Sequence, residues 1–494
     1  MNNKYDIAII GAGIGGLVSA ARLSSLGKKV IIIEKEPRAG GYLTEFNRGG
    51  YVFDASLHLL NGCAEGQYVH DVFKRCGIVD KLSFLKPKYL YRSIFPEHDV
   101  RIPQTDMQAY REVLSKLFPE SANEITNLFE ELSEIYHIVE SAIILRKPSQ
   151  KLLSYLTRTA GEIIDKHVKS LKLKALICQL WMYLGLPPSL SRAIDFCYPW
   201  FDYHSHGGFY LAKGSYEIVR ALKTRTEDNG ACFVFNQTVN KIAIDGMVCK
   251  SVSFGQNDEI LCDEVVSNID LKKTAFELIG KKRFSSVNIK DIDNAVPSIS
   301  AFEIFLGLDA DLFRLYPDDY EIFINFDYDL DDHYCQCLKN NASKAPFLIT
   351  INSNINKFSA PSGKSSVTIT MLAGYDYWVS GSKAEYQDKK QRMADILIDR
   401  ASKIIPEIKS KVSVKSISTP MTFERYTDNS CGAIYGYGSS LNFRHETRTN
   451  CLGGIKNLYF ASAWARQGSG VAKVLRSAED AVERIAKNDG VIKV

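Results

Sequence analysis

The segment that most constrains this chain is residues 7–34, in which strand-like and helix-like sequence alternate around three glycines. An apolar strand at residues 7–10 leads into the glycines Gly11, Gly13 and Gly16 and a helix at residues 14–26. A second apolar strand follows at residues 30–33 and ends at Glu34. A glycine pattern alone is weak evidence, but this whole order is typical of the β-α-β unit that binds a dinucleotide. We therefore predict a Rossmann-like α/β domain.

Each of these residues has a physical role in the expected dinucleotide site. Gly11 permits the tight turn out of the strand, and Gly13, which lacks a Cβ atom, lets a pyrophosphate approach the backbone. Gly16 lets the helix pack closely on the strands, and the helix N-terminus offers N–H groups and a positive dipole end to the phosphates. Glu34 can accept hydrogen bonds from ribose hydroxyls. These features fit either NAD or FAD.

The composition is that of a soluble globular protein with more than one domain. At 494 residues the chain exceeds a single ordinary core, so about two or three domains are expected. The 61 basic and 57 acidic residues balance to a net charge of +4, which argues against a nucleic-acid partner. No apolar run reaches the about 18 residues of a membrane span, and residues 1–6 lack the features of a signal peptide, so we expect a cytoplasmic protein.

No metal site is expected. The 11 cysteines are odd in number and form no C-x-x-C pair, which favours reduced thiols. His333, Cys335 and Cys337 are close in sequence, but no second ligand cluster accompanies them. The acidic run 327–332 lacks the glycine and the glutamate of a calcium loop, which predicts a solvated loop.

A glycine doublet, Gly40–Gly41, follows the second strand, and an NAD site does not need it. A longer cofactor, FAD, would run past this backbone toward its flavin. At this doublet the chain resembles the superfamily of FAD-dependent amine oxidases and phytoene desaturases, in which the dinucleotide unit, the acid and a similar doublet form one extended motif. The resemblance implies that the cofactor is FAD.

Within that superfamily the chain is most similar to the phytoene desaturases, carotenoid isomerases and retinol saturases. Four stretches carry this resemblance: residues 207–215, 263–268, 419–436 and 457–471. It implies an α/β fold in which a Rossmann-like FAD-binding domain is assembled from discontinuous segments and accompanied by a mixed-sheet and helical (α+β) substrate domain. The expected FAD-binding domain consists of residues 1–65, 206–285 and 419–494. Residues 66–205 form a helical insert between the first two parts, and residues 286–418 form the substrate-domain sheet and helix between the last two.

The same resemblance implies which residues contact FAD. The pyrophosphate loop is matched by Gly11, Ala12, Gly13, Ile14, Gly15 and Gly16, and the ribose acid with its neighbour by Glu34 and Lys35. The doublet segment is matched by Gly40, Gly41 and Tyr42, and the valine whose backbone contacts adenine by Val239. The C-terminal flavin segment is matched by Ala463, Trp464, Gly470 and Val471. The chain departs from the family at Tyr42, where amine oxidases usually carry an arginine, and Arg38 could compensate. It also departs at Ala463–Trp464, where Gly-Asp or Gly-Gln is common.

The sequence between residues 66 and 200 is mostly helical in pattern. Residues 122–145 place apolar side chains three and four residues apart, which predicts one face of a long helix. Residues 147–174 combine lysines with leucines and isoleucines, and such a basic amphipathic stretch either contacts an anionic membrane surface or forms a solvated helix face. Further along, alternating sequence predicts strands of a second sheet at residues 298–308, 347–351 and 366–372.

Three residues are candidates for catalysis. His58 closes a Phe-Asp-x-x-x-His pattern similar to that of the retinol saturase branch, and it could exchange a proton while the flavin handles a hydride. The alternative is a histidine that packs or hydrogen-bonds locally. Trp464 is either a platform against flavin or substrate or a core residue, and Tyr435 could form a cavity wall. Residues 203–206 either line a substrate channel or form a surface loop, and the loop is favoured.

The resemblance implies a flavoenzyme that acts on a hydrophobic, unsaturated substrate such as a carotenoid, a retinoid or another polyene. The reaction would be desaturation, saturation or isomerisation at carbon–carbon bonds, with hydride transfer at flavin N5. A soluble oxidase of amines, amino acids or natural-product intermediates is an alternative on the same scaffold, and a non-catalytic lipid carrier is a more remote one. Oxygen, a quinone and NAD(P)H are all candidates for the partner in electron transfer.

Overall fold

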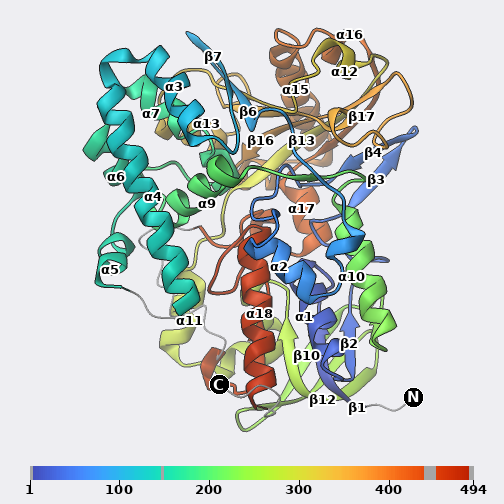
Figure 1. The fold of residues 1–494 in the computed structure, drawn as a ribbon. Helices are drawn as coiled ribbons and strands as arrows, with labels where there is room; N and C mark the ends of the chain where they lie inside the picture. The colour runs from blue at the N-terminus through green and yellow to red at the C-terminus, as the bar shows by residue number, and fades with distance from the viewer. Residues whose placement is uncertain (1–3, 146–148, 439–451, 489–494) are drawn as a thin grey trace.

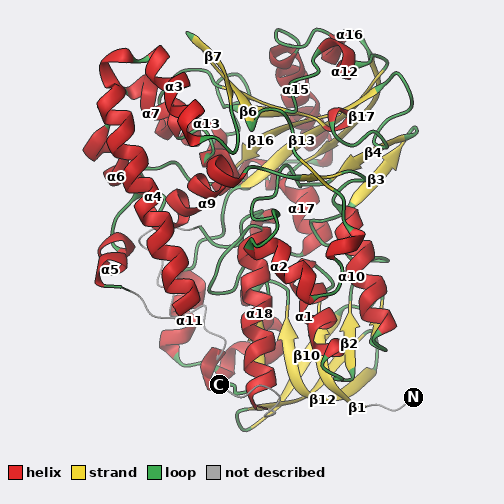
Figure 2. Cartoon of the chain, viewed as in Figure 1, coloured by secondary structure: helices red, strands yellow, loops and turns green. Residues whose placement is uncertain are grey.

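The computed structural model describes residues 4–145, 149–438 and 452–488, and these residues form two units, each built around a mixed β-sheet (Figure 1). The lower unit in Figure 2 holds one sheet with helices in front of it, and the upper unit combines the other sheet with a group of helices at its side. This arrangement confirms the predicted combination of an α/β domain with an α+β companion.

The first sheet joins strands from the beginning, the middle and the end of the chain. Its described strands run in the order β10 (Val239–Asp245), β11 (Val248–Phe254), β12 (Asp258–Ser267), β1 (Lys4–Ile10), β2 (Val30–Ile33) and β9 (Cys232–Val234), and β18 (Leu458–Phe460) also pairs with β12. β1 is parallel to both of its neighbours, with Ile9 opposite Val266 and Ile32. The strands predicted at residues 7–10 and 30–33 are confirmed.

Helices α1 (Ile14–Ser25), α10 (Tyr216–Asp228) and α18 (Val471–Asn488) lie side by side against one face of this sheet (Figure 1). α1 contacts both of the others, so the first and the last helix of the described chain share one apolar core. A second apolar core covers the opposite face. β2 is therefore buried along its whole length, which is why its sequence is continuously apolar rather than alternating.

The second sheet lies in the other unit. Its described strands run in the order β17 (Val412–Ser418), β13 (Ser300–Leu308), β16 (Ser365–Ala373), β15 (Phe347–Ile351), β14 (Glu321–Ile324), β6 (Tyr91–Phe95) and β7 (His98–Ile102). All pairs are antiparallel except β14 with β6. The three strands predicted at residues 298–308, 347–351 and 366–372 are thus confirmed as β13, β15 and β16. All three are buried at every position.

The helical insert includes α2 (Tyr68–Arg75), α3 (Met107–Leu117), α4 (Ala122–Leu145), α5 (Gln150–Leu156), α6 (Ala160–His167), α7 (Leu171–Ile177), α8 (Trp181–Leu184) and α9 (Ala193–His206). α4 confirms the long helix predicted over 122–145. The surface loop favoured at residues 203–206 is wrong: these residues form the last turn of α9, and His204 is buried with its ring stacked on Tyr110 at 4.8 Å. No helix in the described ranges is long and apolar enough to cross a membrane.

Candidate active site and cofactor cleft

A cavity of about 1420 Å³ lies between the two sheets. At one end it is bounded by the ends of β1 and β2, which we call the cofactor end, and at the other by β13, β15 and β16, which we call the substrate chamber. The predicted FAD contacts line it, except Ala12, Gly15 and Gly16, which lie behind the wall. His58 and Tyr435 also line it, so the structure brings both groups of predicted site residues into one cavity.

The glycine loop and the glycine doublet pack directly on each other at the cofactor end. The N–H of Gly40 donates to the carbonyl oxygen of Ala12 at 2.9 Å. A Cβ atom on Gly41, whose φ is +57°, would lie 3.2 Å from the Cα of Gly13. A side chain on Gly41 would therefore press on the glycine loop, and the start of α1 at Ile14 faces the cavity.

Two further glycines let α1 approach the sheet. A Cβ atom on Gly16 would lie 2.1 Å from the carbonyl oxygen of Gly11, which agrees with the close packing predicted for this position. Gly15 is more constrained still, because its Cβ atom would lie 1.6 Å from the carbonyl oxygen of Ala461, just after β18. The sequence motif does not anticipate this second contact, since Ala461 comes from the opposite end of the chain.

Glu34 stands at the end of β2, as predicted, and its carboxylate is already engaged by the backbone. It accepts hydrogen bonds from the N–H of Ala12 at 2.7 Å and of Glu36 at 2.9 Å. Burial raises the pKa of Glu34, and these two donors oppose that shift. Lys35 also lines the cavity, where its ammonium lies 3.3 Å from Asp428 and donates to the carbonyl oxygen of Arg425.

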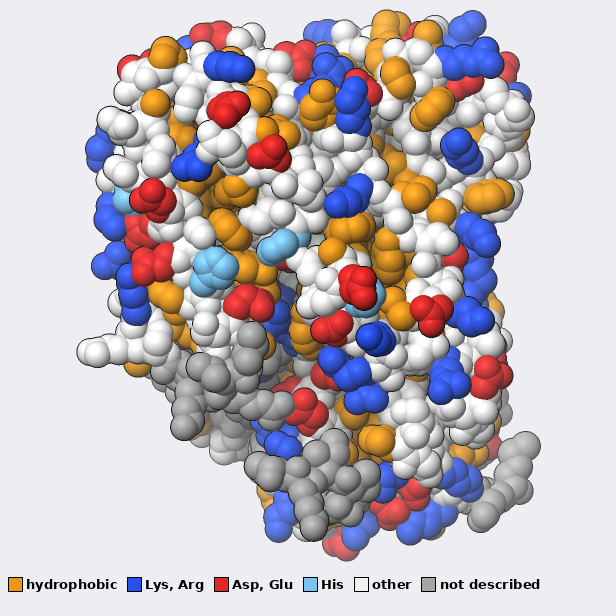
Figure 3. All heavy atoms as spheres, in the orientation of Figure 1, with side chains coloured by type: hydrophobic (Ala, Val, Ile, Leu, Met, Phe, Trp, Pro, Cys, Tyr) orange, Lys and Arg blue, Asp and Glu red, His pale blue; other side chains and the backbone are white. Residues whose placement is uncertain are grey.

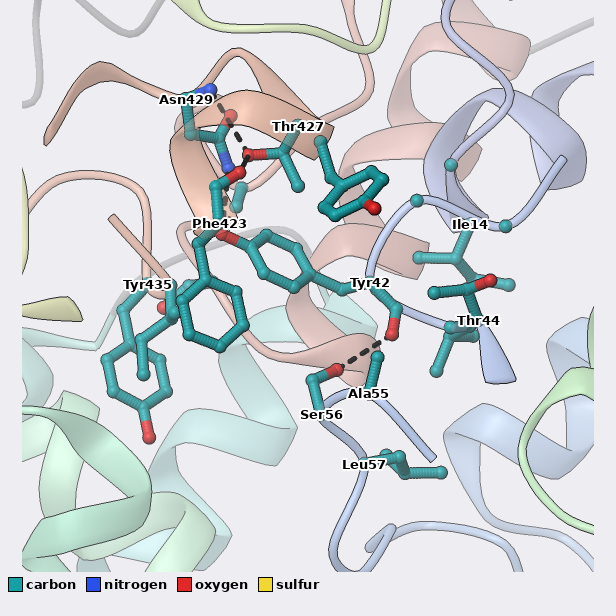
Figure 4. A pocket seen from close by; sticks show the side chains of 18 of the residues that line it. Ile14, Tyr42, Thr44, Ala55, Ser56, Leu57, Phe423, Thr427, Asn429 and Tyr435 are labelled. Atoms are coloured by element: carbon teal, nitrogen blue, oxygen red, sulfur yellow. Dashed lines mark hydrogen bonds between the residues drawn. The ribbon is translucent and has the colours of Figure 1, made fainter. Parts of the chain in front are cut away.

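Tyr42 points away from Ile14 and toward the segment that follows α17 (Pro420–Thr427), as Figure 4 shows. Its hydroxyl donates to the carbonyl oxygen of Ala433 at 3.0 Å and lies 3.4 Å from the amide nitrogen of Asn429. Burial raises the pKa of Tyr42 to about 12, so the side chain stays neutral. At the position where the resemblance to amine oxidases predicts an arginine, this chain therefore has a neutral tyrosine, whose side chain bridges two walls of the cavity.

The C-terminal segment closes the cofactor end from the other side. Gly470, whose φ is +87°, and Val471 place the N-terminus of α18 at the cavity. Trp464 has only 1% of its surface exposed, and its indole N–H donates to Asn429 at 2.9 Å. Trp464 thus lies at the cavity edge with most of its ring in the core, while Ala463 and Val239 line the cavity directly.

These residues fit an FAD molecule. The first-turn N–H groups of a helix have no partner within the helix and attract phosphate oxygens, and α1 offers such an N-terminus beside Gly13. Glu34 and the N-terminus of α18 also line the cavity, where a carboxylate can accept hydrogen bonds from a ribose and a helix N-terminus favours the electron-rich carbonyl edge of a flavin. The residue roles themselves stay predictions.

The substrate chamber is mainly apolar. Alternate residues of β13, Ala301, Glu303 and Phe305, face it, as the two-residue period of a strand requires. Apolar side chains from several other elements complete the wall: Leu57, Leu59, Met182, Leu184, Leu348, Leu372 and Ile434. Tyr435 is part of this wall, as predicted, and its hydroxyl donates to the carbonyl oxygen of Met182 at 2.8 Å.

His58 lies between the two ends of the cavity. Its Nδ1 is 3.1 Å from Oε1 of Glu321 and 3.0 Å from Oγ1 of Thr350, and its ring stacks on Tyr183 at 5.7 Å. Burial on its own lowers the pKa of His58, but the Glu321 carboxylate outweighs burial and raises it. The side chain is 19% exposed, so His58 is both locally hydrogen-bonded and open to the cavity.

Sequence reasoning missed two buried glutamates in the second sheet. Glu303 on β13 has 3% of its surface exposed and Glu321 on β14 has 1%. Burial raises the pKa of both, for Glu303 to about 8, and His58 opposes the shift in each case. The signal that could have found them is a lone acid inside an otherwise apolar strand, as in SAFEIFLGL at residues 300–308.

The lysines of residues 147–174 are largely paired. Lys151, Lys166, Lys172 and Lys174 each form an ion pair with a glutamate or aspartate of the helical insert or of the turn between β6 and β7. On the face in Figure 3, acidic and basic side chains are interspersed. Lys147 lies outside the described residues. The membrane contact stays a prediction, and these pairs leave fewer lysines available for it.

The fold and the cofactor end together define an FAD-dependent oxidoreductase. The sequence profile of the flavin-containing amine oxidoreductase family matches residues 14–486, nearly the whole chain, and the protein belongs to that family. Its FAD cofactor and its place among the oxidoreductases, both inferred from sequence, are thereby confirmed.

Comparison with individual proteins gives the same result. The chain is 25% identical to a 4,4'-diapophytoene desaturase (4,4'-diaponeurosporene-forming) of Staphylococcus aureus strain Newman, with 98% of this chain and 99% of that one covered. Two solved structures share the fold. An oxidoreductase from Methanosarcina mazei superposes with a TM-score of 0.65 at 17% identity, covering 97% of this chain and 100% of its own. Cyclohexylamine oxidase from Brevibacterium oxydans superposes with a TM-score of 0.66 at 15% identity, covering 98% and 99%.

Proposed function

We propose that this protein desaturates a carbon–carbon single bond in a long, apolar polyene such as a carotenoid. The observation that carries the proposal is the continuity of the cofactor end with an apolar chamber in one cavity of about 1420 Å³. Ordinary small-molecule pockets measure roughly 300–1,000 Å³, so this cavity has room for a large cofactor and a large substrate together. The similarity to a 4,4'-diapophytoene desaturase supports the same substrate class.

A desaturation removes a hydride from one carbon and a proton from its neighbour, and the bound flavin supplies the hydride acceptor. The chain has to exclude water, hold the apolar substrate and receive the proton. His58 is suited to the last task because it is open to the cavity and paired with Glu321 on its other side. A separate electron acceptor would be needed to complete the cycle, and oxygen and a quinone are candidates for it.

The test is anaerobic reduction of the FAD-loaded protein by purified polyenes, followed by the bleaching of the flavin absorbance. We expect one polyene class to bleach the flavin and to yield a product two hydrogen atoms lighter by mass spectrometry. The His58→Gln variant should bind FAD and polyene but bleach far more slowly. Bleaching by amines alone, with no response to polyenes, would favour the amine-oxidase alternative and overturn the proposal.

Association with a membrane is a second part of the proposal, because a long polyene dissolves in lipid rather than in water. The candidate surface is the stretch 147–174, predicted from its lysines and leucines. Sedimentation with anionic and with neutral vesicles checks this part. Binding only to anionic vesicles, weakened about fivefold by neutralising Lys169, is the expected result. Equal recovery in the supernatant of both would contradict it.

A further inference from the structure

Glu303 presents an oxygen atom that no described residue satisfies. Its Oε1 accepts a hydrogen bond from the hydroxyl of Thr370 at 3.3 Å, on the neighbouring strand β16. Its Oε2 has no hydrogen-bond partner, although the side chain is 97% buried and faces the substrate chamber. Buried polar atoms are nearly always paired, so such an atom beside a cavity indicates a partner supplied by a ligand.

The neighbouring hydroxyl groups do not fill this gap. Tyr42 donates to the carbonyl oxygen of Ala433, and Tyr435 donates to that of Met182. Along β13 its neighbours on the same sheet face are the apolar Ala301 and Phe305, and across the sheet it lies opposite the hydroxyl residues Thr370 and Ser418. Of these two, Thr370 binds the other carboxyl oxygen, Oε1.

The carboxyl keeps its proton in this setting. Burial raises the pKa of Glu303 to about 8, with His58 opposing the shift and Asp54 adding to it. The other titratable or charged side chains near it are Tyr42, Tyr435 and, on helices that pack against β13, Glu424, Arg425, Glu407 and Lys409. Of these, Glu424 and Glu407 bind Tyr375 and Tyr316, Lys409 binds Asp399, and Arg425 lies over Tyr426. At neutral pH the carboxyl is therefore a hydrogen-bond donor.

We propose that Glu303 contacts the substrate and donates a hydrogen bond to a carbonyl oxygen, which makes the substrate a polyene that carries a carbonyl group. This inference rests on the proposed function and narrows its substrate class. A carbonyl fits this donor because it accepts a hydrogen bond without bringing a donor of its own that would need a further acceptor in the cavity.

The test compares two polyenes of equal chain length, one ending in an aldehyde and one in a methyl group. Each is titrated into the FAD-loaded protein while the polyene absorbance is recorded. We expect the aldehyde to bind about tenfold more tightly, the effect of one buried hydrogen bond, with its absorbance shifted to longer wavelength. In Glu303→Leu both the preference and the shift should be lost, whereas Glu303→Gln, which keeps a donor, should retain them.

The pH dependence of the preference for the aldehyde shows whether the protonated Glu303 carboxyl donates the hydrogen bond. In the wild type the preference should shrink as the pH rises past about 8, because a carboxylate cannot donate, and in Glu303→Gln it should not. Glu217→Gln is the matched control, since Glu217 is another largely buried carboxyl with an unpartnered oxygen but lies outside the cavity. If Glu303→Leu does not fold, the pH comparison of the wild type with Glu303→Gln decides alone.

Equal affinity for the two polyenes, or a preference that survives in Glu303→Leu, would overturn the inference. If the methyl-ended polyene still bleaches the flavin in that case, the proposed function stands and only the carbonyl contact is wrong. If neither polyene binds or bleaches the flavin, the proposed function fails and this inference fails with it.

Discussion

The Nδ1 atom of His58 lies 3.1 Å from Oε1 of Glu321, although 263 positions of sequence separate the two residues. The contact joins the loop that carries His58 to the sheet of the substrate chamber. It also couples the charge of the histidine to that of a glutamate that is 1% exposed.

Replacing Glu321 by glutamine should lower the pKa of His58, because the carboxylate that raises it is removed. The raised folded-state pKa stabilises the protein below the unfolded pKa of about 6.5, and this stabilisation is lost as the pH rises through the folded value. NMR titration of the His58 ring measures the change. Thr350→Val, which removes a hydrogen bond but no charge, should keep the pKa raised. An unchanged His58 pKa in Glu321→Gln would show that Glu321 does not control it.

Glu303→Gln should stabilise the protein against urea unfolding, and the gain should grow with pH. The pKa of Glu303 is about 8 in the folded protein and about 4.3 when unfolded, so the wild type loses stability as the pH rises between these values. Glutamine is neutral throughout and does not suffer this loss. Parallel stability curves for the two proteins over this pH range would contradict the prediction.

Gly15→Ala should destabilise the protein by several kcal/mol, even without FAD, since its Cβ atom would lie 1.6 Å from the backbone oxygen of Ala461. Thermal unfolding of the cofactor-free protein measures the effect. Gly438→Ala serves as the control, because the nearest atom to its added Cβ, the carbonyl oxygen of Val296, is 4.0 Å away. Equal melting temperatures for the two variants would be inconsistent with the structure.

Tyr42→Phe should cost about 1 kcal/mol of stability and leave FAD affinity nearly unchanged. The lost hydroxyl binds the carbonyl oxygen of Ala433, which still accepts from Asn429 at 3.2 Å. Denaturant unfolding and a fluorescence titration with FAD separate the two effects. A large loss of FAD affinity would mean that the hydroxyl, and not the ring alone, acts on the cofactor.

Glu34→Gln should weaken FAD binding by about tenfold or more, since a hydrogen bond to a charged carboxylate contributes about 1.5–3 kcal/mol. The amide oxygen can accept only one of the two backbone N–H groups that Glu34 binds, and the amide NH2 then faces the other, so the melting temperature should also fall. Titration of the cofactor-free protein with FAD gives the affinity, and its melting temperature reports on the loop. Unchanged affinity would remove Glu34 from the ribose site.

The parts of the fold that sequence predicts well are those whose physics is local. The strands 7–10 and 30–33 and the helix 122–145 follow from short-range periodicity, and the structure has them where expected. At residues 203–206 the sequence favours a loop, because polar side chains precede the glycines Gly207 and Gly208. Residues 203–206 lie instead at the end of α9, where His204 stacks on Tyr110 and the shielding from water lowers its pKa to about 3.

The parts that could not be predicted depend on contacts between distant segments. The acids of β13 and β14 become significant only when pairing places Glu303 beside Thr370 and Glu321 beside Thr350, on the face that His58 meets. Asp54 likewise accepts hydrogen bonds from Tyr210 and from Ser215 at the start of α10, more than 150 positions further along the chain. No local pattern specifies such partners.

The pairing of β12 with both β1 and β18 has a consequence for how the protein is made. Val265 lies opposite Ala8 on one side and Leu458 on the other, so the sheet at the cofactor end is complete only after almost the whole chain has left the ribosome. Contacts of such long sequence separation slow folding, because a large loop must close before they form. The glycine loop is synthesised first, but the FAD site it belongs to is incomplete until Ala461 and α18 have been synthesised. We therefore expect FAD to bind only after synthesis of the chain is nearly complete. Until then the apolar strands of this sheet are exposed and prone to aggregation.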